Sequence, residues 1–128
     1  MKKRIILTGT FIGMLAIIFG AFGAHLLKKY LTVEQLATFE IGVRYQMYNA
    51  FFLFFLSSRK ELSKRVLKII YNLAVAGVIL FSGSLYLLAT NNLTVFDFKV
   101  IVFATPIGGF LLILAWLTLF ITILRKKS

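Results

Sequence analysis

Four long apolar runs make up most of this sequence, and short clusters of basic residues separate them. A bilayer core about 30 Å thick requires about 20 apolar residues in a helix. The runs therefore predict membrane spans at about 5–27, 36–57, 69–90 and 99–124. We expect an all-α integral membrane four-helix bundle that forms a single domain over residues 1–128.

The composition argues against an ordinary soluble domain. Hydrophobic residues make up 60% of the chain and charged residues 15%, whereas a soluble domain is about 25% charged. A chain of this length could not bury so much apolar surface in its own core, but lipid can cover it. The net charge of +11 would suggest nucleic acid in a soluble protein. Here the basic residues flank apolar runs, so we expect membrane lipids as partners and no nucleic acid.

The positive charges also predict the orientation. Of the 15 basic residues, eleven precede the first run, lie between the second and third, or follow the fourth. Because cytoplasmic loops carry the excess of Lys and Arg, both termini are predicted to be cytoplasmic, in a multi-pass protein of the bacterial cytoplasmic membrane. The first run resembles a secretory signal peptide but exceeds the about 7–15 apolar residues of such a segment, so we expect it to remain as a span.

A helix start signal precedes the second run. Thr32 and Gln35 have the spacing of a capping box, and Leu31 and Leu36 have that of a hydrophobic staple. The second helix is therefore expected to run from Val33 to about Ser57.

The fourth run contains the only proline, Pro106. Either Pro106 kinks a long helix, or Thr105 and Pro106 are the cap and first residue of a shorter one. We favour a helix that starts near Phe98 and bends at Pro106.

Small residues recur at spacings of three and four along the first run and reappear in the third and fourth. Where lipid removes the usual hydrophobic drive, small residues let helix backbones approach closely. We therefore favour tight packing over the alternative of a backbone-lined path for a small ligand. The residues assigned to helix packing are Gly9, Gly13, Gly20, Gly23, Gly83, Ser84, Pro106, Gly108 and Gly109.

Polar side chains inside or beside the first two runs form a candidate intramembrane site. Its members are His25, Glu40, Arg44, Gln46, Tyr48 and Asn49. Glu40 and Arg44 have the four-residue spacing of a helical ion pair, and Tyr48 lies on the same side. A charge inside hydrocarbon is costly and marks an internal pair or a site. We expect Glu40 and Arg44 to neutralise each other, with a proton or ion relay or a headgroup pocket as the alternative.

Asn49 lies deep enough in the second run to need a hydrogen-bond partner from another helix. We expect Ser82, Ser84 or Thr105 to supply that partner. Gln46 points to the opposite side of its helix. The Asn49 amide is interpreted as a packing contact.

Catalytic and cofactor motifs are lacking. The sequence contains no phosphate loop, no HExxH and no nucleophile elbow. His25 is the only histidine and has no acidic or cysteine neighbour at ligand spacing. We interpret it as an interfacial residue, with pH sensing as the alternative. We expect no enzyme activity, no cofactor and no metal.

Four short segments resemble the DUF423 family of small bacterial membrane proteins. They read GAFGAH at 20–25, YQMY at 45–48, FSGSLY at 81–86 and TPIGG at 105–109. The segments follow the order of the family and cover nearly the whole chain. The chain departs from the family pattern at Leu26, Asn49 and Ala115, and a family histidine replaced by Asn49 puts any two-histidine metal site in doubt.

The resemblance implies a four-span protein without an established activity. It favours a non-enzymatic protein that supports membrane integrity by binding lipid or a partner membrane protein. A small channel or transporter, formed as a homo-oligomer and using the intramembrane polar residues, is the alternative.

Overall fold

The structure is a computed structural model that describes residues 1–93 and 101–126. Its long helices are α1 (Lys2–His25), α2 (Val33–Ser57), α3 (Lys64–Ala89) and α4 (Ala104–Arg125). Short 3-10 turns, η1 (Leu27–Lys29) and η2 (Asn91–Leu93), follow α1 and α3. The described part contains helices and no strand, so the predicted all-α class is confirmed there.

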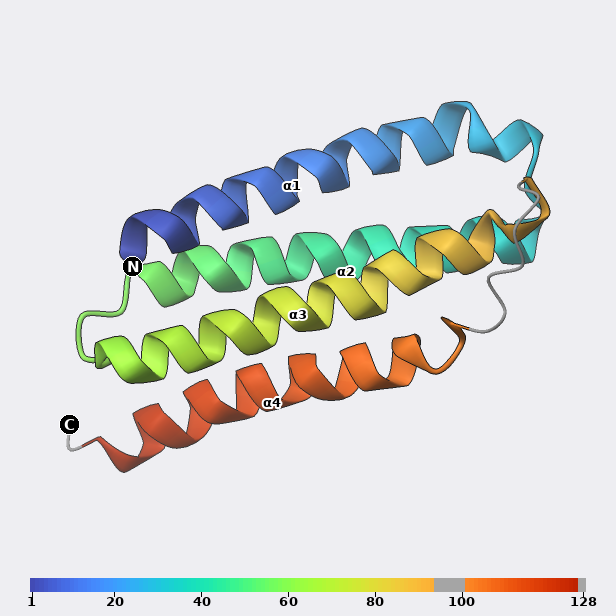
Figure 1. The fold of residues 1–128 in the computed structure, drawn as a ribbon. Coiled ribbons are helices and arrows are strands. Elements are labelled where there is room, and N and C mark those ends of the chain that lie inside the picture. Colours follow the sequence, from blue (N-terminus) through green and yellow to red (C-terminus); the bar gives the residue numbers. More distant parts are fainter. Residues whose placement is uncertain (94–100, 127–128) are drawn as a thin grey trace.

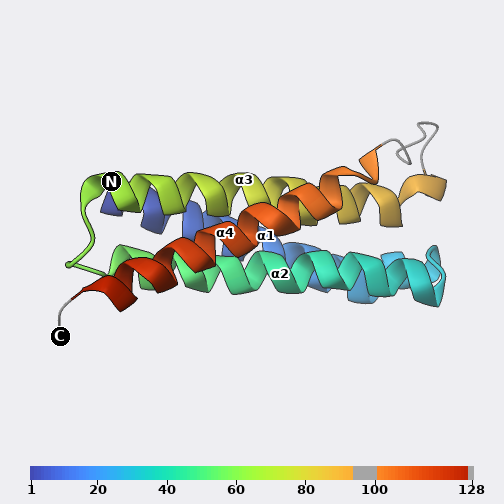
Figure 2. The ribbon, with the colours of Figure 1, turned by 90° about the horizontal axis from the view of Figure 1, so that it is seen from below.

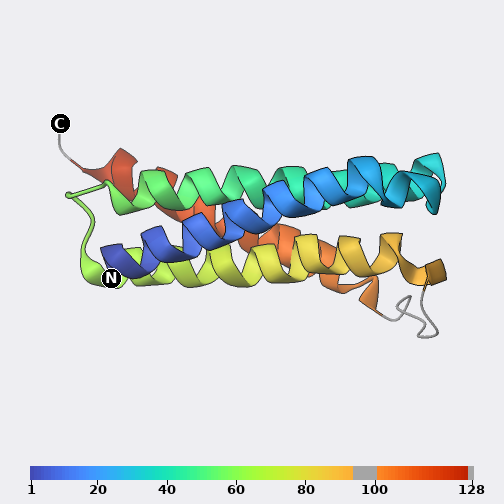
Figure 3. The same ribbon diagram turned by 90° about the horizontal axis from the view of Figure 1, so that it is seen from above.

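The four long helices alternate in direction, so both chain ends lie at the end of the bundle that also holds the α2–α3 connection (Figure 1). α2 and α3 lie side by side as a central pair (Figures 2 and 3). α1 crosses one face of this pair diagonally and α4 crosses the opposite face. α1 packs chiefly on α2, and α4 packs chiefly on α3. The bundle is therefore layered, with α1 and α4 on opposite outer sides.

α1, α3 and α4 are each long and apolar enough to cross a membrane. α2 has a matching length of 25 residues but is less apolar, because it contains Glu40, Arg44, Gln46 and Asn49. The most polar helix thus belongs to the central pair.

α2 begins where the capping box predicts. Thr32 Oγ1 accepts a hydrogen bond from the Gln35 amide at 3.1 Å, and Gln35 Oε1 accepts one from the Thr32 amide at 2.9 Å. These two bonds satisfy amide groups that a helix start leaves free. The predicted range from Val33 to Ser57 is confirmed.

α4 begins later than predicted. Phe98 lies outside the described residues, residues 101–103 form turns, and the helix starts at Ala104 with Phe103 as its N-cap. Pro106 is then the third helical residue, where its missing amide hydrogen leaves no intrahelical bond unmade. The expected long helix bent at Pro106 is therefore wrong. Thr105 does not cap the helix either, since its hydroxyl bonds to Ser84.

The core is centred on the half of the bundle that holds the chain termini. Large apolar side chains that are fully buried there are Ile5, Leu53, Leu56 and Ile70. A smaller cluster at the opposite end contains Leu27, Leu31, Phe39 and Ala89. Large apolar residues on the outer faces of α1 and α4 remain exposed, as expected of surfaces that lipid covers.

Candidate functional site

The glycines of α1 form a stripe that faces α2, and they are Gly9, Gly13, Gly20 and Gly23. A Cβ atom added at Gly9 would lie 2.9 Å from the Phe54 ring, and one at Gly23 would lie 3.1 Å from the Phe39 ring. Added Cβ atoms at the other two would make ordinary contacts with α2 at 3.5 Å. Larger residues at the two ends of the stripe would thus push α1 away from α2.

α3 and α4 approach closely at Gly108. A Cβ atom added there would overlap the backbone amide of Phe81 and would lie 2.8 Å from the carbonyl carbon of Leu80. One turn away, Ser84 Oγ and Thr105 Oγ1 share a hydrogen bond of 2.5 Å. Backbone contact and a hydroxyl pair therefore join the two helices at the same level.

Not every residue assigned to packing lies at a helix contact. A Cβ atom added at Gly83 would meet nothing within 4 Å, so the assignment of Gly83 to helix packing is wrong. Gly109 has room for a Cβ atom, at 3.5 Å from the Phe81 ring. Pro106 is exposed and belongs to the start of α4 rather than to a helix contact.

Gln46 links three helices. Its side chain is 4% exposed, its Nε2 donates to the Ile12 carbonyl of α1 at 2.8 Å, and its Oε1 accepts from the Tyr86 hydroxyl of α3 at 2.5 Å. Nearby, Ser82 Oγ donates to the Gly42 carbonyl at 2.7 Å. The carboxamide of Gln46 is thus engaged at both ends.

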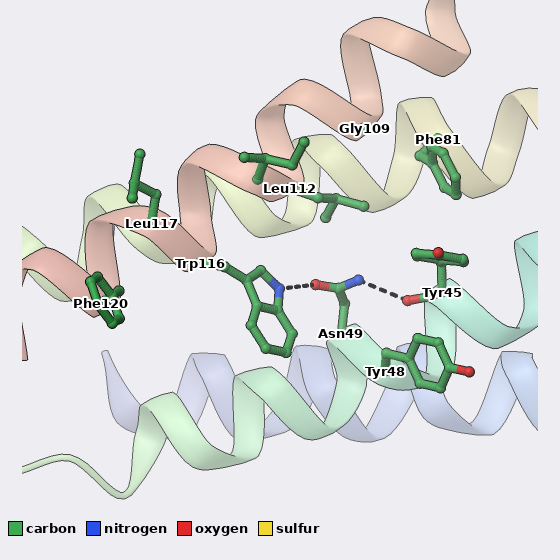
Figure 4. A pocket seen from close by; sticks show the side chains of 10 residues that line it. Tyr45, Tyr48, Asn49, Phe81, Gly109, Leu112, Trp116, Leu117 and Phe120 are labelled. Atoms are coloured by element: carbon green, nitrogen blue, oxygen red, sulfur yellow. Dashed lines mark hydrogen bonds between the residues drawn. The ribbon is translucent and has the colours of Figure 1, made fainter.

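Asn49 binds a residue that we did not predict as its partner. Its Oδ1 accepts a hydrogen bond from the Trp116 indole N–H at 3.1 Å, while its Nδ2 donates to a carbonyl of its own helix (Figure 4). The expected partner among Ser82, Ser84 and Thr105 is wrong. The diagonal course of α4 brings Trp116 toward α2, and the three hydroxyls are engaged elsewhere.

Glu40 and Arg44 do not form the expected ion pair. Both are exposed, and the ion pair found among the described residues joins Arg59 and Glu61 at 3.6 Å. Arg44 Nε instead donates a long hydrogen bond of 3.5 Å to the backbone carbonyl of Glu40. The two residues border a shallow hollow of about 340 Å³ between α1 and α2. The other residues of this hollow are Gly20, Gly23, Phe39 and Val43.

His25 lies apart from these residues. It is exposed at the last position of α1 and, within residues 1–93 and 101–126, makes no side-chain hydrogen bond or ion pair. In the same ranges no three His, Asp or Glu side chains could share a metal ion. The six predicted site residues are therefore distributed over several places rather than gathered in one.

A wide apolar groove separates α4 from α2 (Figure 4). One section has a volume of about 850 Å³ and a second section about 620 Å³. Because Tyr48, Trp116 and Phe120 line both sections, we treat them as one groove, called the α2–α4 groove below. Its polar contact is the bond between Asn49 and Trp116, and the Trp116 ring stacks on Phe52 with 4.5 Å between centroids.

Basic residues lie near the end of the α2–α4 groove where the chain termini are found. The Arg59 guanidinium lies 4.8 Å from the centroid of Phe55, which lines the groove. α4 ends at Arg125, directly after the groove residues Ile123 and Leu124. The groove thus combines a long apolar wall with cations beside one end.

The comparisons with known proteins agree on one family. The family model described as "Protein of unknown function (DUF423)" matches residues 19–109. A UPF0382 membrane protein of Staphylococcus saprophyticus is 35% identical, over 93% of this chain and 95% of its own length. UPF0382 membrane protein YwdK of Bacillus subtilis is 30% identical, over 96% and 98% of the two chains. UPF0382 inner membrane protein YgdD of Escherichia coli is 30% identical, over 90% and 85%. No solved structure matches the chain.

Proposed function

The chain belongs to the DUF423 family of UPF0382 membrane proteins, and from this premise we propose that it is a non-enzymatic lipid-binding protein that supports membrane integrity. It is a multi-pass protein of the cell membrane, and its relatives are named membrane proteins. The proposed binding site is the α2–α4 groove, and the proposed ligand is a membrane phospholipid.

The proposal includes four crossings with both termini in the cytoplasm. α2 runs antiparallel to α1 and α3 and lies against both (Figures 1 to 3). If α1 and α3 cross the membrane, α2 must cross it as well. Basic residues gather beside the chain termini and in the α2–α3 connection, and the excess of positive charge marks the cytoplasmic side.

The observation that carries the lipid proposal is the groove itself. Its walls are aromatic and aliphatic side chains of α2 and α4, and it lies on the outside of the bundle. In a membrane the groove is open to the hydrocarbon core, so a lipid acyl chain can enter it directly. Arg59 and Arg125 near its cytoplasmic end are suited to the phosphate of the same lipid.

The groove offers little for catalysis. Its carboxamide, that of Asn49, is engaged by Trp116 and by its own helix. Tyr45 and Tyr48 contribute hydroxyls but no carboxylate or imidazole lines the groove among the described residues. General acid–base catalysis needs such a partner within hydrogen-bond reach. A binding function fits these residues better.

Fluorescence of Trp116 can test the proposal, because Trp116 is the only tryptophan. In vesicles that contain phospholipids with brominated acyl chains, a lipid held in the groove should quench Trp116 at low mole fractions of brominated lipid. The control is Trp116→Phe combined with Ile17→Trp, which places a tryptophan on the exposed surface of α1. Equal quenching curves for both proteins would refute a groove site.

A channel or transporter is the second candidate, supported by the exposed charges of Glu40 and Arg44 at the hollow between α1 and α2. Ion flux into vesicles should then fall when Glu40→Gln or Arg44→Ala is introduced. Flux that neither substitution alters would rule out this role for them.

A further inference from the structure

We propose that the outward face of α2 is an interface between two copies of this chain, joined by reciprocal ion pairs between Glu40 of each copy and Arg44 of the other. The proposal requires that α2 crosses the membrane, as proposed above. Glu40 and Arg44 lie outside the α2–α4 groove, whereas Tyr48, Phe51 and Phe55 of the same face line it.

The outward face of α2 differs from the outer surfaces of α1 and α4. Residues at spacings of three and four share one face of a helix, and an exposed stripe of this kind runs along α2. It comprises Val33, Ala37, Glu40, Arg44, Tyr48, Phe51 and Phe55. The exposed residues in the middle of α1 and α4 are apolar apart from Thr10. Thus α2 presents ionised groups on its outer surface, whereas the middle parts of α1 and α4 present mainly hydrocarbon side chains.

These ionised groups lie at membrane depth. With a rise of 1.5 Å per residue, Glu40 and Arg44 are about 6 and 12 Å along α2 from residue 36, where the predicted span begins, in a bilayer core of about 30 Å. Gly20 and Gly23, which border the same hollow, belong to the apolar run of α1. Charges at such depth normally face a partner or a water-filled cavity.

Neither group has a charged partner within the described part of the chain. Among residues 1–93 and 101–126, the one hydrogen bond of these two side chains runs from Arg44 Nε to the Glu40 carbonyl. The Glu40 carboxylate has no ion-pair partner in the same ranges. The compensating charges must therefore come from outside the described part of the chain.

A second copy supplies both compensating charges at once. Two chains inserted in the same orientation and related by a two-fold axis along the membrane normal place identical residues at equal depth. The Arg44 side chain already extends toward the level of Glu40, so its guanidinium can reach the carboxylate of a facing copy. Ala37, the next stripe residue, is small and permits close approach of two α2 helices. An anionic headgroup would satisfy Arg44 but would repel Glu40, which favours the second copy.

Disulfide formation gives the first test, because the chain has no cysteine of its own. Under oxidising conditions in vesicles, Ala37→Cys should yield a covalent dimer. Ile17→Cys, exposed on α1, is the matched control and should remain monomeric. Equal yields from the two positions at low protein density would overturn the proposal. Reaction of Ala37→Cys in intact vesicles with a membrane-impermeant thiol reagent would show instead that this part of α2 is outside the membrane, so the two failures are distinguishable.

Charge reversal gives the second test. Glu40→Arg creates two cations on the stripe and Arg44→Glu creates two anions, so each variant alone should associate about tenfold or more weakly in single-molecule photobleaching. The two variants mixed in one vesicle should form heterodimers, and the double variant E40R/R44E should again form homodimers. Both residues are exposed, so helical content by circular dichroism should not change.

The alternatives predict other patterns. If Glu40 and Arg44 instead pair within one chain, the double variant should recover the native behaviour but the mixture of single variants should not. If the two residues instead bind a lipid headgroup, neither the double variant nor the mixture should recover the native behaviour. Either pattern would overturn the interface.

Discussion

The side-chain oxygen of Gln46 on α2 accepts a hydrogen bond from the Tyr86 hydroxyl on α3, with 2.5 Å between the two atoms. The nitrogen of the same carboxamide donates to Ile12 on α1, so a single side chain joins the three helices. The Tyr86 ring also packs edge-on against Phe19, with 5.1 Å between centroids. Polar and apolar contacts therefore coincide at one point between α1, α2 and α3.

We predict that Tyr86→Phe lowers the free energy of unfolding in lipid bicelles by about 1 kcal/mol, which lies between the average of about 0.6 and the maximum of about 1.7 kcal/mol for hydrogen bonds between membrane helices. The substitution keeps the ring contacts and leaves the buried oxygen of Gln46 without its donor. Tyr48→Phe is the control, because the Tyr48 hydroxyl makes no hydrogen bond within the described residues. It should change the unfolding free energy by less than about 0.3 kcal/mol. Equal effects of the two substitutions would show that the bond to Gln46 contributes nothing.

A second prediction compares two glycines of different surroundings. Gly108→Ala should destabilise the protein by about 2 kcal/mol or more, because the added methyl group overlaps the backbone of α3 and forces α4 outward. Gly83→Ala adds its methyl group to open space. It should be neutral or stabilise by about 0.5–1 kcal/mol, through the better helix propensity of alanine. The same unfolding assay measures both, and a larger loss at Gly83 would contradict the packing of α3 on α4.

Features set by local sequence could be predicted. α2 starts at Val33 because Thr32 and Gln35 interact within one helical turn, and that interaction needs no information about other helices. The apolar runs likewise define four long helices. The start of α4 was harder to predict, because Pro106 is compatible both with a bend and with a first turn.

Features set by helix arrangement could not be predicted. Spacing alone cannot show that Gly108 meets the backbone of α3 while Gly83 faces open space. The partner of Asn49 depends on the diagonal crossing of α4, which no local pattern encodes. The same crossing opens the α2–α4 groove, which the sequence pattern does not predict. The sequence signal for the contact with Asn49 is the lone tryptophan in the fourth apolar run, because an indole N–H that is removed from water requires a hydrogen-bond acceptor.

Coupling between Asn49 and Trp116 is the third prediction. In a double-mutant cycle with Asn49→Leu and Trp116→Phe, the two substitutions should be non-additive by about 0.6 kcal/mol, and at most about 1.7 kcal/mol, as for other hydrogen bonds between membrane helices. Asn49→Leu combined with Ser84→Ala is the control pair, since Ser84 binds Thr105 instead. Additive effects of Asn49 and Trp116 would mean that their bond does not hold α4 against α2.

The proposed topology gives the last prediction. Lys28 lies between α1 and α2, and Ser63 lies between α2 and α3, and both are exposed. Because the native chain lacks cysteine, Lys28→Cys and Ser63→Cys each provide a single reactive thiol. In spheroplasts, a membrane-impermeant maleimide should label Lys28→Cys directly and Ser63→Cys only after the membrane is permeabilised. The reverse pattern would place the termini outside the cytoplasm and contradict the orientation inferred from the positive charges. Direct labelling of both thiols would show that α2 does not cross, which would remove the basis for placing Glu40 and Arg44 at membrane depth.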